Sequence, residues 1–151
     1  MNGSANGGEP RIVVGVDGSE GSRHALRWAA RQAGFTGAVV EAVIAWQFPV
    51  FFGWAPPYPD GVDFAHCAQQ ALDEAIEEVF GPERPGWLRA RVVEGNAARV
   101  LVEASEGAEL LVVGSRGYGA FTDALLGSVS TYCVHHAHGP VTVIRPGSNP
   151  T

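Results

Sequence analysis

The sequence predicts an α/β protein in which five parallel strands form one doubly wound sheet with helices on both faces. Two observations carry this prediction. Short apolar runs, typical of strands buried on both faces, recur at residues 12–16, 39–45, 110–113 and 141–144. Segments with helical spacing of apolar residues separate them. Strands that alternate with helices in this way favour a parallel sheet with crossover helices.

The first strand and helix are expected directly after the N-terminal ten residues. The strand is the run Ile12 to Val16, and Asp17-Gly18-Ser19 breaks it. Ser19 is a good N-cap, and apolar residues at helical spacing predict a helix from about Glu20 to Ala33. The second strand is then expected at Val39 to Ala45.

An irregular segment follows, from Trp46 to Gly61. It holds four prolines and six aromatic residues, a composition that excludes a regular helix or strand. Two interpretations remain open. The segment either packs over the sheet edge or the helix ends, or forms a flap over a ligand or a partner contact, since long loops in compact domains are often functional.

The strongest helical pattern runs from Val62 to Phe80, with one apolar face and an acidic face opposite. Cys67 falls in the apolar pattern and is expected in the core. Residues 87–93 alternate apolar and arginine positions, which is typical of a partly exposed edge strand. Asn96 is expected to cap a short helix that runs through Ala104.

The stretch after the buried run 110–113 has the features of a phosphate cradle. Gly114 and Gly117 follow the strand, and Gly127-Ser128 begins a helical pattern that Gly139-Pro140 ends. Glycines let the backbone approach an anion closely. A helix N-terminus adds unpaired N–H groups and a partial positive charge.

The spacing G-x2-G-x9-G-S, with VVGVDGSEGS near the N-terminus, resembles the ATP-binding branch of the universal stress protein family. The resemblance covers about Arg11 to Pro146. We therefore expect a domain at 11–146, a disordered lead at 1–10 and a tail at 147–151. It implies strand order 3-2-1-4-5, and ligands of such sheets bind where the strand order reverses.

The resemblance also implies the roles of particular residues. The backbone amides of Gly117, Gly127, Ser128 and Val129, with the hydroxyls of Ser128 and Ser130, would hold the triphosphate of ATP, and Mg²⁺ would bind through the phosphates only. Both serines can equally cap the helix. The predicted binding residues are Gly15, Val16, Asp17, Ile44, Val113, Gly114, Arg116, Gly117, Gly127, Ser128, Val129 and Ser130.

Three of these residues have more specific expectations. Asp17 either caps the first helix or accepts hydrogen bonds from the ribose or adenine. Arg116 is either solvated or offsets phosphate charge. By resemblance, Ile44 or a residue next to it presents its backbone to the adenine.

Composition excludes several other classes of function. The formal net charge of −6 argues against a nucleic-acid surface. All ten basic residues are arginine, so there is no P-loop lysine. Two distant cysteines favour a reducing, cytoplasmic location, and no apolar run approaches the ~18 residues of a membrane helix. The first residues lack the pattern of a signal peptide.

No catalytic constellation is recognisable, and His135, His136 and His138 lack the spacing and partners of a zinc site. We expect a cytoplasmic stress-response protein that binds ATP as a switch, in which ATP orders the loop 118–126. A homodimer through the edge strand Val141 to Ile144 is implied. The alternatives are a slow ATPase, or a dimeric scaffold that binds AMP, cyclic AMP or no nucleotide.

Overall fold

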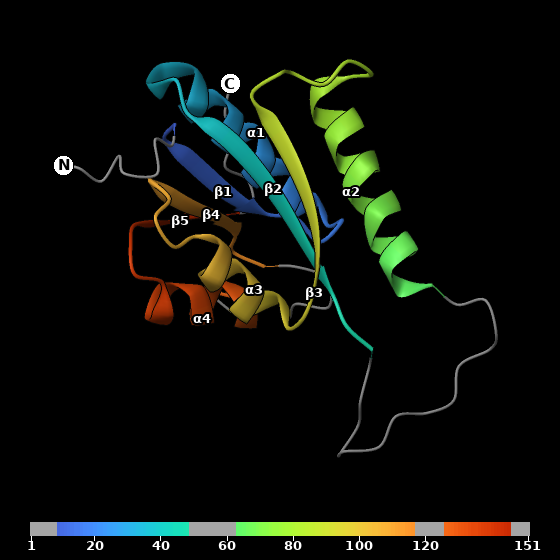
Figure 1. The fold of residues 1–151 in the computed structure, drawn as a ribbon. Coiled ribbons are helices and arrows are strands. Elements are labelled where there is room, and N and C mark those ends of the chain that lie inside the picture. The colour runs from blue at the N-terminus through green and yellow to red at the C-terminus, as the bar shows by residue number, and fades with distance from the viewer. Residues whose placement is uncertain (1–8, 49–62, 117–125, 146–151) are drawn as a thin grey trace.

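The computed structural model describes residues 9–48, 63–116 and 126–145, and it contains nine regular elements in those ranges. Strands and helices alternate throughout, as the sequence predicts (Figure 1). The elements are β1 (Arg11–Gly15), α1 (Glu20–Thr36), β2 (Val39–Trp46), α2 (Phe64–Phe80), β3 (Leu88–Glu94), α3 (Ala97–Ala104), β4 (Leu110–Gly114), α4 (Ser128–His136) and β5 (Val141–Ile144).

The five strands form one parallel sheet in the order β3-β2-β1-β4-β5, which confirms the predicted topology. Helices α1 and α2 cover one face of the sheet, and α3 and α4 cover the other (Figure 1). Successive side chains of a strand point to opposite faces. Val14 therefore packs towards α1 and α2, and its neighbour Val13 packs towards α3 and α4.

Local signals set most helix ends. Ser19 caps α1 by accepting a hydrogen bond from the Ser22 amide at 3.2 Å. The helix continues past the predicted end at Ala33, because Gly37 adopts a left-handed conformation (φ 76°) and its amide donates to the Ala33 carbonyl. Asn96 caps α3 as expected.

The prediction for Cys67 is wrong, because this side chain is exposed. The buried positions of α2 are Ala68, Leu72, Ala75 and Ile76. Cys67 immediately precedes the first of these. One residue rotates the helix by about 100°, which turns Cys67 away from the sheet.

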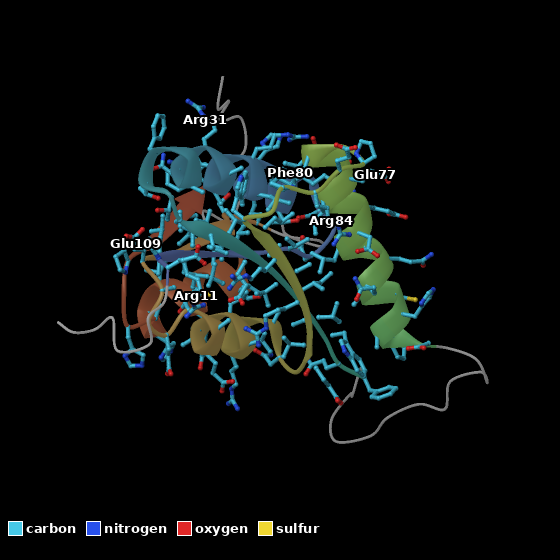
Figure 2. All side chains as sticks on the ribbon, turned by 45° about the horizontal axis from the view of Figure 1, so that its top comes forward. Arg11, Arg31, Glu77, Phe80, Arg84 and Glu109 are labelled. Carbon is cyan, nitrogen blue, oxygen red and sulfur yellow. The ribbon has the colours of Figure 1, made fainter. Side chains whose placement is uncertain are left out.

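The connection from α2 to β3 is pinned to the helix by an ion pair. Arg84 Nη2 donates to Asp73 Oδ1 at 2.7 Å, and both side chains are partly exposed. Figure 2 labels Arg84, which lies beside α2. This hydrogen bond from Arg84 lowers the pKa of the Asp73 carboxyl from its ordinary value. Phe80 and Trp87 stack edge to face beside it, with ring centroids 5.6 Å apart.

Of the aromatic segment from Trp46 to Gly61, residues 49–61 lie outside the described residues. At the described end, Phe48 stacks edge to face on Trp46 and on Phe64, the first residue of α2. This end of the segment thus packs on a helix end, as the first interpretation expects. Among the helices of the ranges above, none is long and apolar enough to cross a membrane.

Candidate functional site

The carboxyl ends of β1 and β4 lie side by side at the centre of the sheet, where Val14 pairs with Val112. From β1 the chain proceeds to β2 and β3 on one side, and it returns to β4 and β5 on the other. The strand order therefore reverses between β1 and β4, which is where open α/β sheets bind their ligands. The ends of these two strands and the turns after them carry six of the twelve predicted binding residues, which are Gly15, Val16, Asp17, Val113, Gly114 and Arg116.

The turn after β1 holds Asp17 in a defined position. Asp17 Oδ1 accepts hydrogen bonds from the backbone amide and the hydroxyl of Ser19, and the Asp17 amide donates to Ser22 Oγ at 3.3 Å. Ser19, not Asp17, is the N-cap of α1. Asp17 is exposed, and its second oxygen, Oδ2, makes no hydrogen bond to a described residue. Its carboxylate is therefore oriented by one oxygen and open at the other.

The turn after β4 packs directly on the first turn of α1. A Cβ atom at Gly114 would lie 3.1 Å from the carbonyl carbon and oxygen of Gly21, and one at Gly21 would lie 2.9 Å from the Arg116 carbonyl oxygen. Both distances are shorter than ordinary packing tolerates. The two glycines thus let backbone meet backbone, which joins the turn that carries Asp17 to the turn that carries Arg116.

Ser115 connects β4 to two further elements. Its amide donates to the Ile144 carbonyl of β5 at 2.8 Å. Its carbonyl accepts from the Gly127 amide and from Ser130 Oγ, the latter at 3.0 Å. These hydrogen bonds hold the start of α4 next to the residue that follows β4.

The N-terminus of α4 has no side-chain cap. Its N-cap residue is Gly127, and no acidic residue lies in its first turn. The amides of Ser128, Val129 and Ser130 have no intrahelical partner, and they bond to none of the described residues. Three main-chain donors and the positive end of the helix dipole thus converge at the crevice.

The two serines of this turn differ in their surroundings. Ser130 is buried, and its hydroxyl lies within hydrogen-bond distance of the Ser115 and Gly127 carbonyl oxygens. This hydroxyl ties α4 to the preceding turn, so its expected contact with phosphate stays a prediction. Ser128 is exposed at the start of the helix.

Carbonyl directions at the end of β2 bear on the expected base contact. The Val43 carbonyl accepts from Val16 on the β1 side, and the Trp46 carbonyl accepts from Gly95 on the β3 side. Carbonyls alternate in direction along a strand. The Ile44 carbonyl therefore points towards β3. The Ala45 carbonyl points to the β1 side, beyond the carboxyl end of β1.

Three of the predicted residues hold the site by packing. Val16 and Val113 are buried on opposite faces of the sheet. A Cβ atom at Gly15 would lie 2.6 Å from Leu101 Cδ1, so this glycine allows α3 to approach β1. Arg116 is half-buried, and both expected roles of its side chain stay predictions. Gly117 lies outside the described residues.

Sequence reasoning missed two residues of this site. Gly21 is a glycine inside the first turn of a helix, where its helix propensity is poor, and that mismatch is the signal that could have found it. Ser115 is buried, and its Oγ has no hydrogen-bond partner among the described residues. Ser115 is one of the two positions that the motif G-x2-G leaves unspecified, so the motif does not indicate a structural role for it.

Within the described ranges, no group of three or more His, Cys, Asp and Glu residues is arranged to hold a metal ion. Tyr132 and His136 stack on one another on α4, with ring centroids 4.1 Å apart. The groups that converge at the crevice are main-chain amides and hydroxyls, which can donate, and the Asp17 carboxylate, which accepts, and they suit a ligand with anionic groups and hydroxyls.

The model of the universal stress protein family matches residues 10–145. A universal stress protein of Mycolicibacterium smegmatis is 37% identical over 143 residues, covering 89% of this chain and 47% of that protein. One from Mycobacterium tuberculosis is 35% identical over 156 residues, covering 92% and 49%. The chain thus spans about half the length of the curated relatives it matches.

Solved structures of the same family share this fold. The universal stress protein UspA from Lactobacillus plantarum superposes with a TM-score of 0.71 at 20% identity, over 91% of this chain and 98% of that one. A universal stress protein in complex with cAMP superposes with a TM-score of 0.66 at 26% identity, over 90% and 96%.

Proposed function

The chain belongs to the universal stress protein family, and we propose that it binds ATP at the carboxyl ends of β1 and β4. Within this proposal, ATP binding acts as a switch in a stress response. The proposal rests chiefly on one observation, the uncapped N-terminus of α4 fastened beside the end of β4. An adenine nucleotide in the family member solved with cAMP supports the class of ligand.

The phosphates are proposed to bind to the amides of Ser128, Val129 and Ser130. These groups are unpaired within the helix, and no carboxylate in the first turn opposes an anion there. Gly114 keeps the neighbouring backbone free of a side chain. Main-chain donors therefore replace the lysine that a P-loop uses, which suits a chain without lysine.

The nucleoside is proposed to lie between the ends of β1 and β2. Asp17 Oδ2 is free to accept from a ribose hydroxyl, since Oδ1 is held by Ser19. The alternation along β2 moves the proposed base contact from Ile44 to Ala45, whose carbonyl points towards the open side of β1. Mg²⁺ fits as an ion carried by the phosphates, where it would neutralise their charge.

Titration of the purified protein with ATP, AMP and cyclic AMP tests the ligand. If three linked phosphates are recognised, we expect ATP with Mg²⁺ to bind more tightly than AMP, and AMP at least as tightly as cyclic AMP. Tightest binding of cyclic AMP would instead favour the alternative of a cyclic-nucleotide scaffold. Equal, weak binding of all three would contradict a phosphate cradle at α4.

Replacement of Ser128 separates main-chain recognition from recognition by the hydroxyl. Ser128 is the first residue of α4, and Gly127 before it is extended (φ −75°, ψ 172°), so proline fits at this position. Ser128→Pro removes the amide donor and the hydroxyl, whereas Ser128→Ala removes only the hydroxyl. We expect ATP affinity to fall about tenfold or more in Ser128→Pro, with a smaller loss in Ser128→Ala. Equal losses would contradict main-chain recognition.

The switch requires that ATP change the surface that a partner protein reads. The proposed element is the loop 118–126, of which residues 118–125 lie outside the described ranges. Hydrogen exchange of this loop, measured with and without ATP, tests the proposal, and protection on binding is expected. A homodimer through β5 and a cytoplasmic location remain parts of the same proposal.

A further inference from the structure

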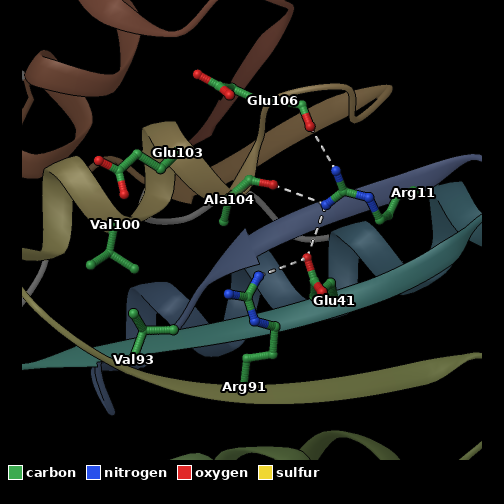
Figure 3. Close-up of a pocket in the computed structure, with 8 residues that line it drawn as sticks. All are labelled: Arg11, Glu41, Arg91, Val93, Val100, Glu103, Ala104 and Glu106. Atoms are coloured by element: carbon green, nitrogen blue, oxygen red, sulfur yellow. Dashed lines mark hydrogen bonds and ion pairs between the residues drawn. The ribbon is translucent and has the colours of Figure 1, made fainter. Parts of the chain in front are cut away.

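A cavity that shares no lining residue with the predicted nucleotide site lies on the face of the sheet that α3 covers. Its volume is about 390 Å³, and it opens between α3 and the sheet (Figure 3). Arg11, which lines it, is the first residue of β1, and Glu106 lies in the connection that precedes β4. The lining extends from these residues at the amino end of β1 and β4 to Val93, which pairs with Ala45 near the carboxyl end of β2.

A buried carboxylate forms the floor of this cavity. Glu41 sits in the middle of β2 with a side chain that is only 11% exposed. Arg11 Nη1 donates to its Oε1 at 3.0 Å, and the second oxygen, Oε2, makes no hydrogen bond to a described residue. Glu41 lines the cavity, so Oε2 can accept a hydrogen bond from a group bound there.

The two arginines beside Glu41, Arg11 and Arg91, differ in how many hydrogen bonds they make to the protein. Arg11 is held in place by the protein, since three of its five N–H groups donate to Glu41 and to the carbonyls of Ala104 at 2.9 Å and Glu106 at 2.7 Å. Arg91 lies with Nη1 3.6 Å from Glu41 Oε1, which is too long for a hydrogen bond. Arg91 bonds to no described residue otherwise, and 47% of its side chain is exposed. Its guanidinium therefore has donors available for an anionic group (Figure 3).

The side of the cavity formed by α3 carries negative charge, opposite to that of Arg91. Glu103 lies near the C-terminus of this helix, where the helix dipole favours a cation, and its carboxylate makes no ion pair with a described residue. Val93, Val100 and Ala104 supply apolar surface to the same cavity. The cavity thus combines an available cation, available carboxylate oxygens and a short aliphatic wall.

We propose that this cavity binds a free α-amino acid with a small aliphatic side chain. The ligand carboxylate would bind to Arg91, and its ammonium group would donate to Glu41 Oε2 and Glu103. The side chain would pack on Val93 and Val100. A zwitterion satisfies both signs at once without adding net charge, which neither a simple anion nor a simple cation can do. This site is independent of the proposed nucleotide binding.

Calorimetric titration with L-leucine tests the proposal, with N-acetyl-L-leucine and L-leucinamide as probes that each lack one charge. We expect L-leucine to bind at millimolar concentration or below. Each blocked compound should bind about tenfold more weakly or worse, as the loss of a charge-assisted hydrogen bond predicts. Failure of L-leucine to bind, or equal binding of N-acetyl-L-leucine or L-leucinamide, would overturn the zwitterion assignment.

Three variants locate the binding. Arg91→Gln and Glu103→Gln change exposed side chains, so both should fold, and each should weaken L-leucine binding about tenfold. Arg89→Gln is the matched control, because Arg89 lies on the same strand and face but does not line the cavity. Amide shifts on adding L-leucine should appear at Arg91 and Val100. Unchanged affinity in Arg91→Gln and Glu103→Gln, or shifts confined to Gly114 and Gly127, would refute the site.

Discussion

At the scale of single residues, the site depends on two glycines that touch from different elements. Gly114 ends β4 and Gly21 lies in the first turn of α1, and each leaves no room for a Cβ atom. Their close approach fixes the relative positions of α1 and the turn after β4. It places the start of α1, with Asp17 and Ser19, against the turn that follows β4 and carries Arg116.

Replacing Gly21 with alanine tests this close approach. Alanine favours a helix over glycine by about 1 kcal/mol, but here its Cβ would lie 2.9 Å from a backbone oxygen. We expect a net loss of about 1–2 kcal/mol in the free energy of unfolding, measured by urea titration. Gly34→Ala in the same helix meets nothing within 4 Å, and it should stabilise by about 0.5–1 kcal/mol. Equal gains in both variants would refute the tight contact.

The two cysteines should differ in reactivity, because burial raises the pKa of the Cys133 thiol to about 11, whereas Cys67 is exposed. A thiolate is the reactive form, and it is scarce at Cys133 at neutral pH. A thiol reagent at pH 8 should therefore modify one cysteine rapidly in the native protein and the second only on unfolding. The fast phase should be absent from Cys67→Ser and retained in Cys133→Ser.

At the scale of elements, an arginine of β1 ties the C-terminal end of α3 to the sheet, in addition to the apolar packing of Val100 and Leu101. Arg11 donates to the carbonyls of Ala104 and Glu106 at the C-terminal end of α3, and to Glu41 of β2. A cation at a helix C-terminus is favourable, and this one also offsets a buried carboxylate. One side chain thereby fixes a helix and two strands.

Removing Arg11 should cost more than removing the whole pair. Arg11→Met removes the hydrogen-bonded partner of the mostly buried Glu41 carboxylate and leaves Arg91, whose Nη1 lies 3.6 Å from Oε1. We expect a loss of about 3 kcal/mol in the free energy of unfolding. The double variant Arg11→Met with Glu41→Leu should recover more than half of that loss. Denaturant titration of the three proteins measures the difference, and additive losses would contradict a charge-burial cost.

At the scale of the whole molecule, β5 is an edge strand, paired with β4 on one side. The carbonyls of Pro140 and Ile144 bond to β4, so by alternation the backbone of Val143 faces the free edge and that of Thr142 faces β4. The free edge is the surface through which the proposed homodimer would form.

Proline substitutions on β5 separate the two edges. Proline is tolerated where the strand amide faces solvent. Val143→Pro should therefore keep the fold but convert a dimer to a monomer, as measured by light scattering. Thr142→Pro should destabilise the monomer itself, because it removes a hydrogen bond to β4. A dimer that persists in Val143→Pro would contradict assembly through β5.

Much of the fold could be predicted from the sequence, since its signals are local. The apolar runs of β1, β2 and β4 and the caps Ser19 and Asn96 act through near neighbours in the chain. The resemblance to the family then supplied the strand order. The prediction for Cys67 failed because exposure on a helix changes with a rotation of one residue.

By itself, the sequence determined the alternation of elements, the absence of a lysine-based phosphate site and the glycine spacing that points to an anion. Only the tertiary structure decided that Gly21 packs on Gly114 and that the Ser115 carbonyl accepts hydrogen bonds from the start of α4. It also decided that the Ala45 carbonyl points to the β1 side of β2. The physical reason is that these contacts join backbone groups of distant segments. Nearly every residue offers the same backbone N–H and C=O groups. Which backbone groups pair therefore depends on where neighbouring strands end, and the residue types do not reveal it.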